Sequence, residues 1–211
     1  MAKLQRRSPV ALPGEAQSVR QDHGWTVVTE YVGESAGPWL VDASHVNKWD
    51  IQARNLDRLD SEALRVPSAP GECRWQGGRL TMRLNPSQAA AWDLSGQGLP
   101  HPEGPELTDV SEASALLAVL GQESYSILEK LSDLDLGRPG LPSLKLWQAP
   151  VCGVPCRVVR LLDPHGGVGV VLGFSRGYAA SMTMALLEAG REFGLAPGGE
   201  GRLTEVCATL G

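Results

Sequence analysis

The sequence predicts an α+β protein whose strands form antiparallel sheets arranged as two ferredoxin-like halves. The chain has 211 residues, of which 42% are hydrophobic, so it is long enough to bury a sizeable core. Short apolar runs separated by Gly and Pro indicate many strands and turns. Strands and helices do not alternate strictly, as a parallel sheet would require.

The breaks in the pattern predict how the chain is divided. Residues 1–22 are expected to form an extended N-terminal arm, because prolines and glycine interrupt any regular period. Residues 23–211 then form the domain, with halves at about 23–98 and 106–211. The Gly- and Pro-rich stretch between them is the expected connector.

In the first half, strands are expected at 25–32, 39–41 and 45–51. Asn55 is a suitable cap for a helix over 56–64, whose leucines recur at helical spacing. Gly77-Gly78 separates two apolar runs and predicts a two-residue hairpin turn. Pro86 favours the start of another helix, over 86–92.

The second half repeats this order of elements without detectable sequence identity to the first. Strands are expected at 115–120, 144–151, 154–162 and 168–174. Helices are expected at 122–131 and 177–189, where apolar residues recur on one face.

Charge and hydropathy exclude several classes of partner. The formal net charge is −5, which offers no bulk positive field to nucleic acid or to an anionic membrane. No apolar run approaches the roughly 18 residues of a membrane span. The basic N-terminus lacks the apolar segment of a secretory signal, so a cytoplasmic location is expected.

Metal-ligand spacing is lacking. Four cysteines have no paired C-x-x-C units, and we expect buried free thiols. Three of the four histidines lie in loops and share no helix face, so no bound metal is expected. The residues in question are Cys73, Cys152, Cys156 and Cys207, and His23, His101 and His165.

Other polar motifs have plain structural readings. Gly166-Gly167 lacks the rest of a phosphate-binding loop and predicts a turn. Asp42, Ser44 and His45 are the residue types of a catalytic triad, but they are too close along a strand to converge on one atom. Turn and cap roles are therefore expected for Asp42 and Ser44. Capping also accounts for Asp109, Asp133 and Asp135.

Three arginines allow two readings. Arg157 and Arg160 on one strand, with Arg176 before the last helix, form a small anion-binding group if the fold brings them together. Otherwise they are solvated surface charges.

Several segments in order resemble the glycine cleavage T protein, the tetrahydrofolate-dependent aminomethyltransferase family. The family opens with a Gly-Trp pair and a later Asp-x-Ser-His, which Gly24-Trp25 and residues 41–45 match. Residues 109–122 resemble its strand and following helix, and residues 189–203 resemble its Gly-Leu-x-Pro-x-Gly segment. The resemblance implies the folate-binding fold.

The sequence departs from this family where the chemistry resides. In the transferase, an Asp-Asp pair follows the Gly-Gly hairpin and one carboxylate acts on folate. Here Thr81 and Met82 occupy those positions, and neither can supply a carboxylate. The folate-contacting Glu expected near residues 160–170 also has no evident counterpart.

The present sequence, which lacks these groups, resembles the gamma subunits of heterotetrameric sarcosine oxidases. Residues 6–9 and 174–179 carry this likeness. It implies a non-catalytic subunit in an amine-oxidising flavoprotein complex, whose larger subunits hold the flavin. For this chain it leaves Arg160, Arg176 and Tyr178 as the expected contacts to an anion or to tetrahydrofolate, with no catalytic residue.

Two alternatives stay open. One is an active folate-dependent transferase whose carboxylate comes from elsewhere, for example Asp109 or Glu72. The other is a folate-binding regulator or repair accessory of the same fold.

Overall fold

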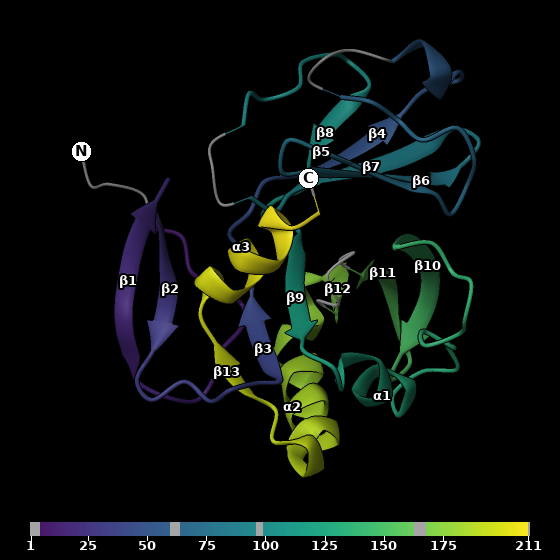
Figure 1. Cartoon of the computed structure of the whole chain (residues 1–211). Coiled ribbons are helices and arrows are strands. Elements are labelled where there is room, and N and C mark those ends of the chain that lie inside the picture. The colour runs from purple at the N-terminus through teal and green to yellow at the C-terminus, as the bar shows by residue number, and fades with distance from the viewer. Residues whose placement is uncertain (1–4, 60–63, 96–98, 163–167, 211) are drawn as a thin grey trace.

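The computed structural model describes residues 5–59, 64–95, 99–162 and 168–210, and these form layers of antiparallel sheet and helix (Figure 1). The predicted α+β class is therefore confirmed. No helix within these ranges is long and apolar enough to cross a bilayer.

A five-stranded sheet forms one layer, at the top of Figure 1. Its order is β5-β6-β7-β4-β8, and every neighbouring pair is antiparallel. Its strands are β4 (Lys48–Gln52), β5 (Cys73–Gln76), β6 (Arg79–Asn85), β7 (Gln88–Asp93) and β8 (Leu107–Asp109).

A six-stranded sheet forms the next layer, in the order β10-β11-β12-β9-β3-β13. All its pairs are antiparallel except β13 with β3. Its strands are β3 (Trp39–Asp42), β9 (Ser114–Leu120), β10 (Leu144–Val151), β11 (Val154–Leu162), β12 (Val168–Ser175) and β13 (Ala196–Gly198).

The remaining elements lie around these sheets. A separate hairpin of β1 (Ala16–Asp22) and β2 (Trp25–Tyr31) stands beside α3 (Figure 1). Two other α-helices are α1 (Ser124–Glu129) and α2 (Ala179–Gly190), and α3 is Glu200–Ala208. Short 3-10 turns are η1 (Leu56–Arg58), η2 (Arg176–Tyr178) and η3 (Arg191–Phe193).

The apolar run of β9 is buried on both faces. Leu117 and Val119 pack in the core that α1 and α2 cover. Leu116 and Leu120 point the other way and pack against the five-stranded sheet, next to Trp92. Successive strand residues face opposite sides, so a continuous apolar run is what a doubly covered strand requires.

The predicted Gly-Gly hairpin is confirmed. Arg79 pairs with Gln76 across the two-residue turn, and both glycines have positive φ, 56° at Gly77 and 94° at Gly78. This is the backbone of the twisted hairpin turns that glycine favours.

The predicted helix over 86–92 is wrong, because these residues enter strand β7. Asn85 pairs with Gln88 across Pro86-Ser87, and the Asn85 Oδ1 accepts a hydrogen bond from the Ser87 backbone N at 3.0 Å. Asn followed by Pro is favourable turn chemistry, which here outweighs the helix propensity of the following alanines.

Of the helix expected over 56–64, the structure describes one 3-10 turn. Asn55 caps it as predicted, accepting a hydrogen bond from the Asp57 backbone N at 3.1 Å. The turn ends at Arg58, and Leu64 forms a strand-like bridge instead. Residues 60–63 lie outside the described ranges, as do residues 163–167 with the expected glycine turn.

Two further expectations, the buried cysteines and the extended N-terminal arm, are met only in part. All four cysteines are free, and Cys156 and Cys207 are buried, but Cys152 is exposed because it forms the β10–β11 turn. Residues 16–22 of the expected arm form strand β1.

The division into two halves stays a prediction, although β3 and β8 each pair with strands of the other half.

Gly173 sets the spacing between the two sheets. A Cβ added at Gly173 would lie 2.4 Å from the Trp92 ring. We expect Gly173→Ala to lower the free energy of unfolding by roughly 1–3 kcal/mol, because the ring must shift. Urea denaturation measures this.

The matched control is Gly177→Ala, where an added Cβ has nothing within 4 Å. Its effect should stay within about 0.5 kcal/mol. Equal losses in both variants would contradict this account of the sheet spacing.

Candidate functional site

A cavity with a volume of about 750 Å³ lies between the two sheets. That size is typical of sites for cofactor-sized molecules. Its lining is mainly apolar. The side chains come from β4, β7, β10, β11 and β12, and include Trp92, Ala149, Pro150, Pro155 and Phe174. We call this cavity the inter-sheet cleft.

Asp50 and Arg157 are the charged residues among those described as lining the inter-sheet cleft, and they face each other. An Asp50 Oδ1 lies 3.3 Å from the Arg157 Nη2, and both side chains are largely buried. Asp50 also accepts hydrogen bonds from Gln88 at 2.8 Å and Gln52 at 2.7 Å. Three donors therefore occupy most of the acceptor positions of its carboxylate.

Burial lowers the pKa of Arg157, and the Asp50 carboxylate opposes that shift. An arginine stays protonated in either case, so the pair is an ion pair. A carboxylate held this way is poorly suited to act as a general base, because its lone pairs already have partners.

The positions after the Gly-Gly hairpin supply no carboxylate to the inter-sheet cleft. Met82 is fully buried between the sheets, and Thr81 faces the opposite side of β6. Asp109 and Glu72, the carboxylates considered as substitutes, are both exposed and do not line the cleft. Each accepts hydrogen bonds within its own turn, from the backbone N of Ser111 and of Ala69.

The arginines expected to bind an anion are held apart. Arg160 is buried against α1, where its Nε donates to the Tyr125 hydroxyl at 2.9 Å. Its Nη1 donates to the carbonyls of Leu141 and Pro142 at 3.2 and 3.0 Å. Arg157, three residues away on the same strand, faces the inter-sheet cleft instead.

Arg176 and Tyr178 share the turn η2, outside the cleft. The Arg176 Nη2 donates to the Arg7 carbonyl at 2.5 Å, and its Nη1 lies 3.7 Å from Glu112. Tyr178 is 48% exposed. These two residues share no recorded partner with Arg160.

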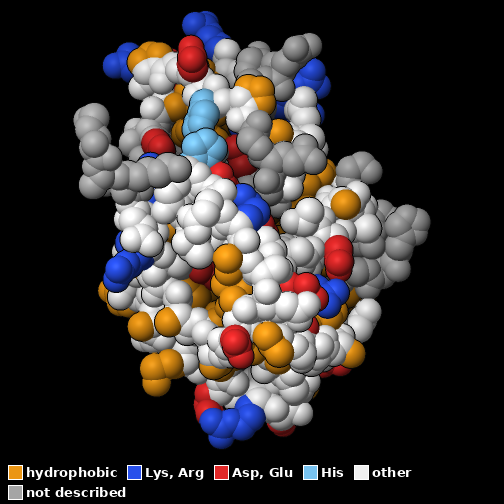
Figure 2. Space-filling model, turned by 90° about the vertical axis from the view of Figure 1, so that its left-hand side faces the viewer, with side chains coloured by type: hydrophobic (Ala, Val, Ile, Leu, Met, Phe, Trp, Pro, Cys, Tyr) orange, Lys and Arg blue, Asp and Glu red, His pale blue; other side chains and the backbone are white. Residues whose placement is uncertain are grey.

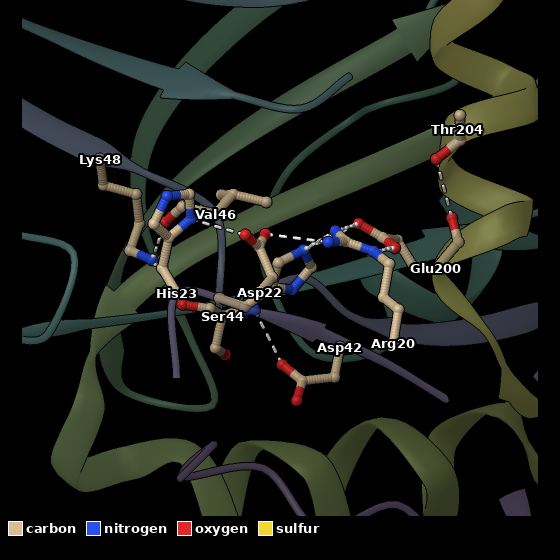
Figure 3. A network of polar contacts seen from close by, with 10 residues as sticks. Arg20, Asp22, His23, Asp42, Ser44, Val46, Lys48, Glu200 and Thr204 are labelled. Carbon is tan, nitrogen blue, oxygen red and sulfur yellow. Dashed lines mark hydrogen bonds and ion pairs between the residues drawn. The ribbon is translucent and has the colours of Figure 1, made fainter. Parts of the chain in front are cut away.

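Sequence reasoning missed a largely buried polar cluster formed by Arg20, His45 and Glu200. Figure 3 labels Arg20 and Glu200 of this cluster. Arg20 donates to both Glu200 oxygens, at 2.7 and 2.5 Å. The His45 Nε2 lies 2.8 Å from Glu200 Oε1. The cluster joins β1, the loop after β3, and the first turn of α3, which are up to 180 residues apart in sequence.

The electrostatics of this cluster follow from its hydrogen bonds. Burial would raise the pKa of Glu200, but hydrogen bonds from Arg20 and His45 outweigh it and lower the pKa to about 2. The ionised form of Glu200 is thus strongly favoured in the folded protein.

A second carboxylate fixes the same helix. Glu34 accepts hydrogen bonds from the backbone N of Gly199 at 2.7 Å and from the Arg202 Nε at 2.8 Å. Arg202 also lies over the Trp39 ring, 4.9 Å from its centroid. A Cβ at Gly199 would collide with the Thr29 carbonyl at 2.1 Å, so glycine is needed there.

The turn role expected for Asp42 is confirmed, because its Oδ1 accepts from the Ser44 backbone N at 2.9 Å. The local cap role expected for Ser44 is wrong, because its Oγ accepts from the Leu116 backbone N at 3.1 Å, on strand β9 and 72 residues away. His45 turns to Glu200 and joins neither. Within the described residues, no group of three or more His, Cys, Asp or Glu side chains could hold a metal.

Comparisons with known proteins match this fold. Residues 84–205 match the family model described as the GCVT N-terminal domain. The aminomethyltransferase of Chlorobium phaeovibrioides (strain DSM 265 / 1930) is 36% identical over 100 residues, covering 47% of this chain and 27% of the relative. That of Thermoanaerobacter sp. (strain X514) is 31% identical over 216 residues, covering 90% and 55%.

A solved structure is similar in fold. One chain of the heterotetrameric sarcosine oxidase from Corynebacterium sp. U-96, in complex with pyrrole 2-carboxylate, matches with a TM-score of 0.60 and 18% identity. The match covers 76% of this chain and 88% of that one. In contrast, this chain spans only about a quarter to a half of the aminomethyltransferases that it matches.

The low pKa of Glu200 predicts a defined acid transition. The stability contributed by its ionised form is complete above the ordinary glutamate pKa of 4.5 and is lost as the pH falls to about 2. We expect Glu200→Gln to cost roughly 2–3 kcal/mol at neutral pH, with the difference from wild type shrinking across that window. Urea denaturation at several pH values measures it.

Glu205→Gln is the matched control on the same helix, because the Glu205 side chain is 68% exposed. Its small effect should not change across the same pH range. A pH-independent loss in Glu200→Gln would contradict the assigned electrostatics.

Proposed function

The chain belongs to the family of the GCVT N-terminal domain, and from that premise we propose that it is a non-catalytic subunit of an amine-oxidising flavoprotein complex. One observation carries this proposal. The carboxylate described in the inter-sheet cleft, Asp50, is bound by Arg157 and two glutamines. The sequence resemblance to the transferases agrees with this, since it implies that Thr81 and Met82 stand where that family has carboxylates.

The fold neighbour supports the same assignment. That chain comes from a heterotetrameric sarcosine oxidase, and the match covers 88% of it. A chain with a similar fold, most of which the match covers, therefore occurs within a multi-subunit amine oxidase. In our proposal the larger subunits bind the flavin and oxidise the amine, while this chain contributes to assembly.

The location is part of the proposal. All four cysteines are free thiols, and one of them, Cys152, is exposed. Exposed thiols persist in reducing compartments. We therefore place the complex in the cytoplasm.

A second candidate is a folate-binding protein, either an active transferase or an accessory. Two observations favour it: the matched relatives are named aminomethyltransferases, and the inter-sheet cleft has the size of a cofactor site. Its walls, with Trp92, Phe174 and two glutamines, fit a planar heterocycle such as the tetrahydrofolate ring. They do not supply a free carboxylate for transfer chemistry.

In the folate-binding candidate, anion contacts outside the cleft would come from Arg176 and Tyr178 in turn η2. Arg160 is a weaker member of this set, since its guanidinium already donates to two carbonyls and to Tyr125.

Native purification tests the subunit proposal. We expect the full chain, isolated from its own cells under gentle conditions, to bring down larger chains that carry flavin absorption and oxidise a secondary amine. The purified chain alone should transfer no one-carbon unit to tetrahydrofolate. Transfer by the isolated chain, or a colourless monomer after purification, would contradict the proposal.

The folate candidate has a separate test in the melting temperature. Tetrahydrofolate at 100 times its dissociation constant would add about 2.7 kcal/mol to the free energy of unfolding. Ala149→Trp fills the inter-sheet cleft and should abolish this shift, whereas Ala180→Trp on the exposed side of α2 should not. No shift in the wild type would remove this candidate.

A further inference from the structure

The hairpin β1–β2 has one edge to which no strand of the described residues is paired. Its two strands form a sheet of their own, and β1 is the outer strand (Figure 1). The other strand, β2, lies against α3 and β13. The unpaired edge is therefore the outer edge of β1, residues 16–22, which we call the β1 edge.

The turn of this hairpin determines which backbone groups point out of the β1 edge. His23-Gly24 is a two-residue turn with positive φ at both positions, 44° and 90°, and Asp22 pairs with Trp25 across it. The pair that flanks such a turn is hydrogen-bonded, and hydrogen-bonded pairs alternate with non-hydrogen-bonded pairs along an antiparallel ladder. The backbone N–H and C=O groups of Gln21 and Val19 therefore point away from β2.

These outward groups are accessible and have no recorded backbone partner in the described part of the chain. The backbone hydrogen bonds recorded outside helices and strands do not involve Val19 or Gln21. Both residues are exposed, and Val19 is 53% accessible to solvent. A row of unpaired donors and acceptors along a strand is complementary to another extended strand. The backbone chemistry of the β1 edge thus specifies a β-strand as its partner.

The side chains of β1 leave this edge open to pairing. Lysine and proline, which commonly protect sheet edges, do not occur in residues 16–22. The two charged residues of the strand have partners inside the molecule, because Arg20 pairs with Asp22 at 3.0 Å and with Glu200 at 2.5 Å. The register shifts of the hairpin lie between Ala16 and Val19, so the strand pairs regularly from Val19 to Asp22.

A second copy of this chain is complementary to the β1 edge. Two identical strands that run antiparallel about a two-fold axis place the donors of each opposite the acceptors of the other. Positions 17, 19 and 21 of β1 read Gln-Val-Gln, which is symmetric about Val19. A two-fold axis at Val19 therefore brings valine against valine and glutamine against glutamine, and β-branched pairs of this kind stabilise a sheet.

Charge and overlap favour this register over the other two that bring outward groups face to face. An axis at Arg20 places the two guanidinium groups opposite each other, and like charges in that position are destabilising. An axis at Gln21 pairs only the last residues before the turn. An axis at Val19 overlaps the whole strand and places Arg20 opposite Ser18.

The surface around the β1 edge does not oppose association. Figure 2 views the molecule from this side, and acidic and basic side chains are scattered over the face with uncharged surface between them. Because no broad region of a single sign is visible on this face, a second copy meets no strong repulsive field there.

We propose that the β1 edge is a self-association surface, on which two copies of the chain pair antiparallel about a two-fold axis at Val19. The two hairpins then form one continuous four-stranded sheet. This inference goes beyond the proposed subunit role and does not depend on it. It is also independent of the inter-sheet cleft, because none of the residues described as lining the cleft belongs to β1.

Analytical ultracentrifugation of the full chain over a wide range of concentrations tests the proposal. We expect a reversible equilibrium between monomer and dimer. Hydrogen exchange measured by NMR at low and high concentration locates the surface. The amides of Val19 and Gln21 should gain protection in the dimer, whereas the amide of Arg20, which faces β2, should change little.

Two variants at the axis separate edge pairing from other kinds of association. Val19→Pro removes an outward N–H from each copy and leaves the β1–β2 ladder intact, so the dissociation constant of the dimer should rise at least tenfold. Val19→Lys introduces two like charges at the axis and should also weaken the dimer severalfold. As a change at an exposed position, Val19→Lys keeps the test available if Val19→Pro does not fold.

Val32→Lys is the matched control, because Val32 is 57% exposed, lies outside β1 and receives the same added charge. It should dimerise as the wild type does. The proposal would be overturned by a chain that stays monomeric at every concentration, by a dimer that both Val19 variants leave unchanged, or by equal weakening in Val32→Lys. Protection confined to amides outside β1 would overturn it as well.

Discussion

The burial of both faces of the six-stranded sheet is the constraint on which the rest of this structure depends. Strand β9 sends Leu117 and Val119 to the helix side and Leu116 and Leu120 to the other sheet. Each face needs a cover, so α1 and α2 occupy one and the five-stranded sheet the other. The inter-sheet cleft is the part of the second interface that side chains leave unfilled, and Trp92 can approach β12 only because residue 173 is glycine.

The segments that carry the family resemblance stabilise the fold. Residues 41–45 and 198–202 meet, and their contacts place α3 against β2 and β3 through the Arg20–His45–Glu200 cluster and through Glu34. These contacts stabilise the fold and do not involve the residues that follow the Gly-Gly hairpin. Family membership therefore does not by itself establish a reaction, because fold and reaction depend on different residues.

Much of the fold could be predicted because its signals are local. The Gly77-Gly78 turn, the apolar run of β9 and the last long helix each follow from a few adjacent residues. The alanines of β7 were misread because their propensity favours helix, whereas their burial between layers is a tertiary effect. The partner of His45 lies 155 residues away, and Arg157 and Arg160 diverge because an odd spacing on a strand reverses the face.

Two carboxylates that face cavities have partners within the protein, and this bears on function. Asp50 in the inter-sheet cleft has a cation and two amides, so the protein itself satisfies its charge. Asp42 accepts hydrogen bonds from the Ser8 hydroxyl and the Ser44 backbone N, and its charge also favours the protonated form of the buried Lys48. A carboxylate that the fold satisfies in this way supports structure rather than proton transfer. Any selectivity of the inter-sheet cleft therefore rests on shape and apolar contact rather than on a free charge.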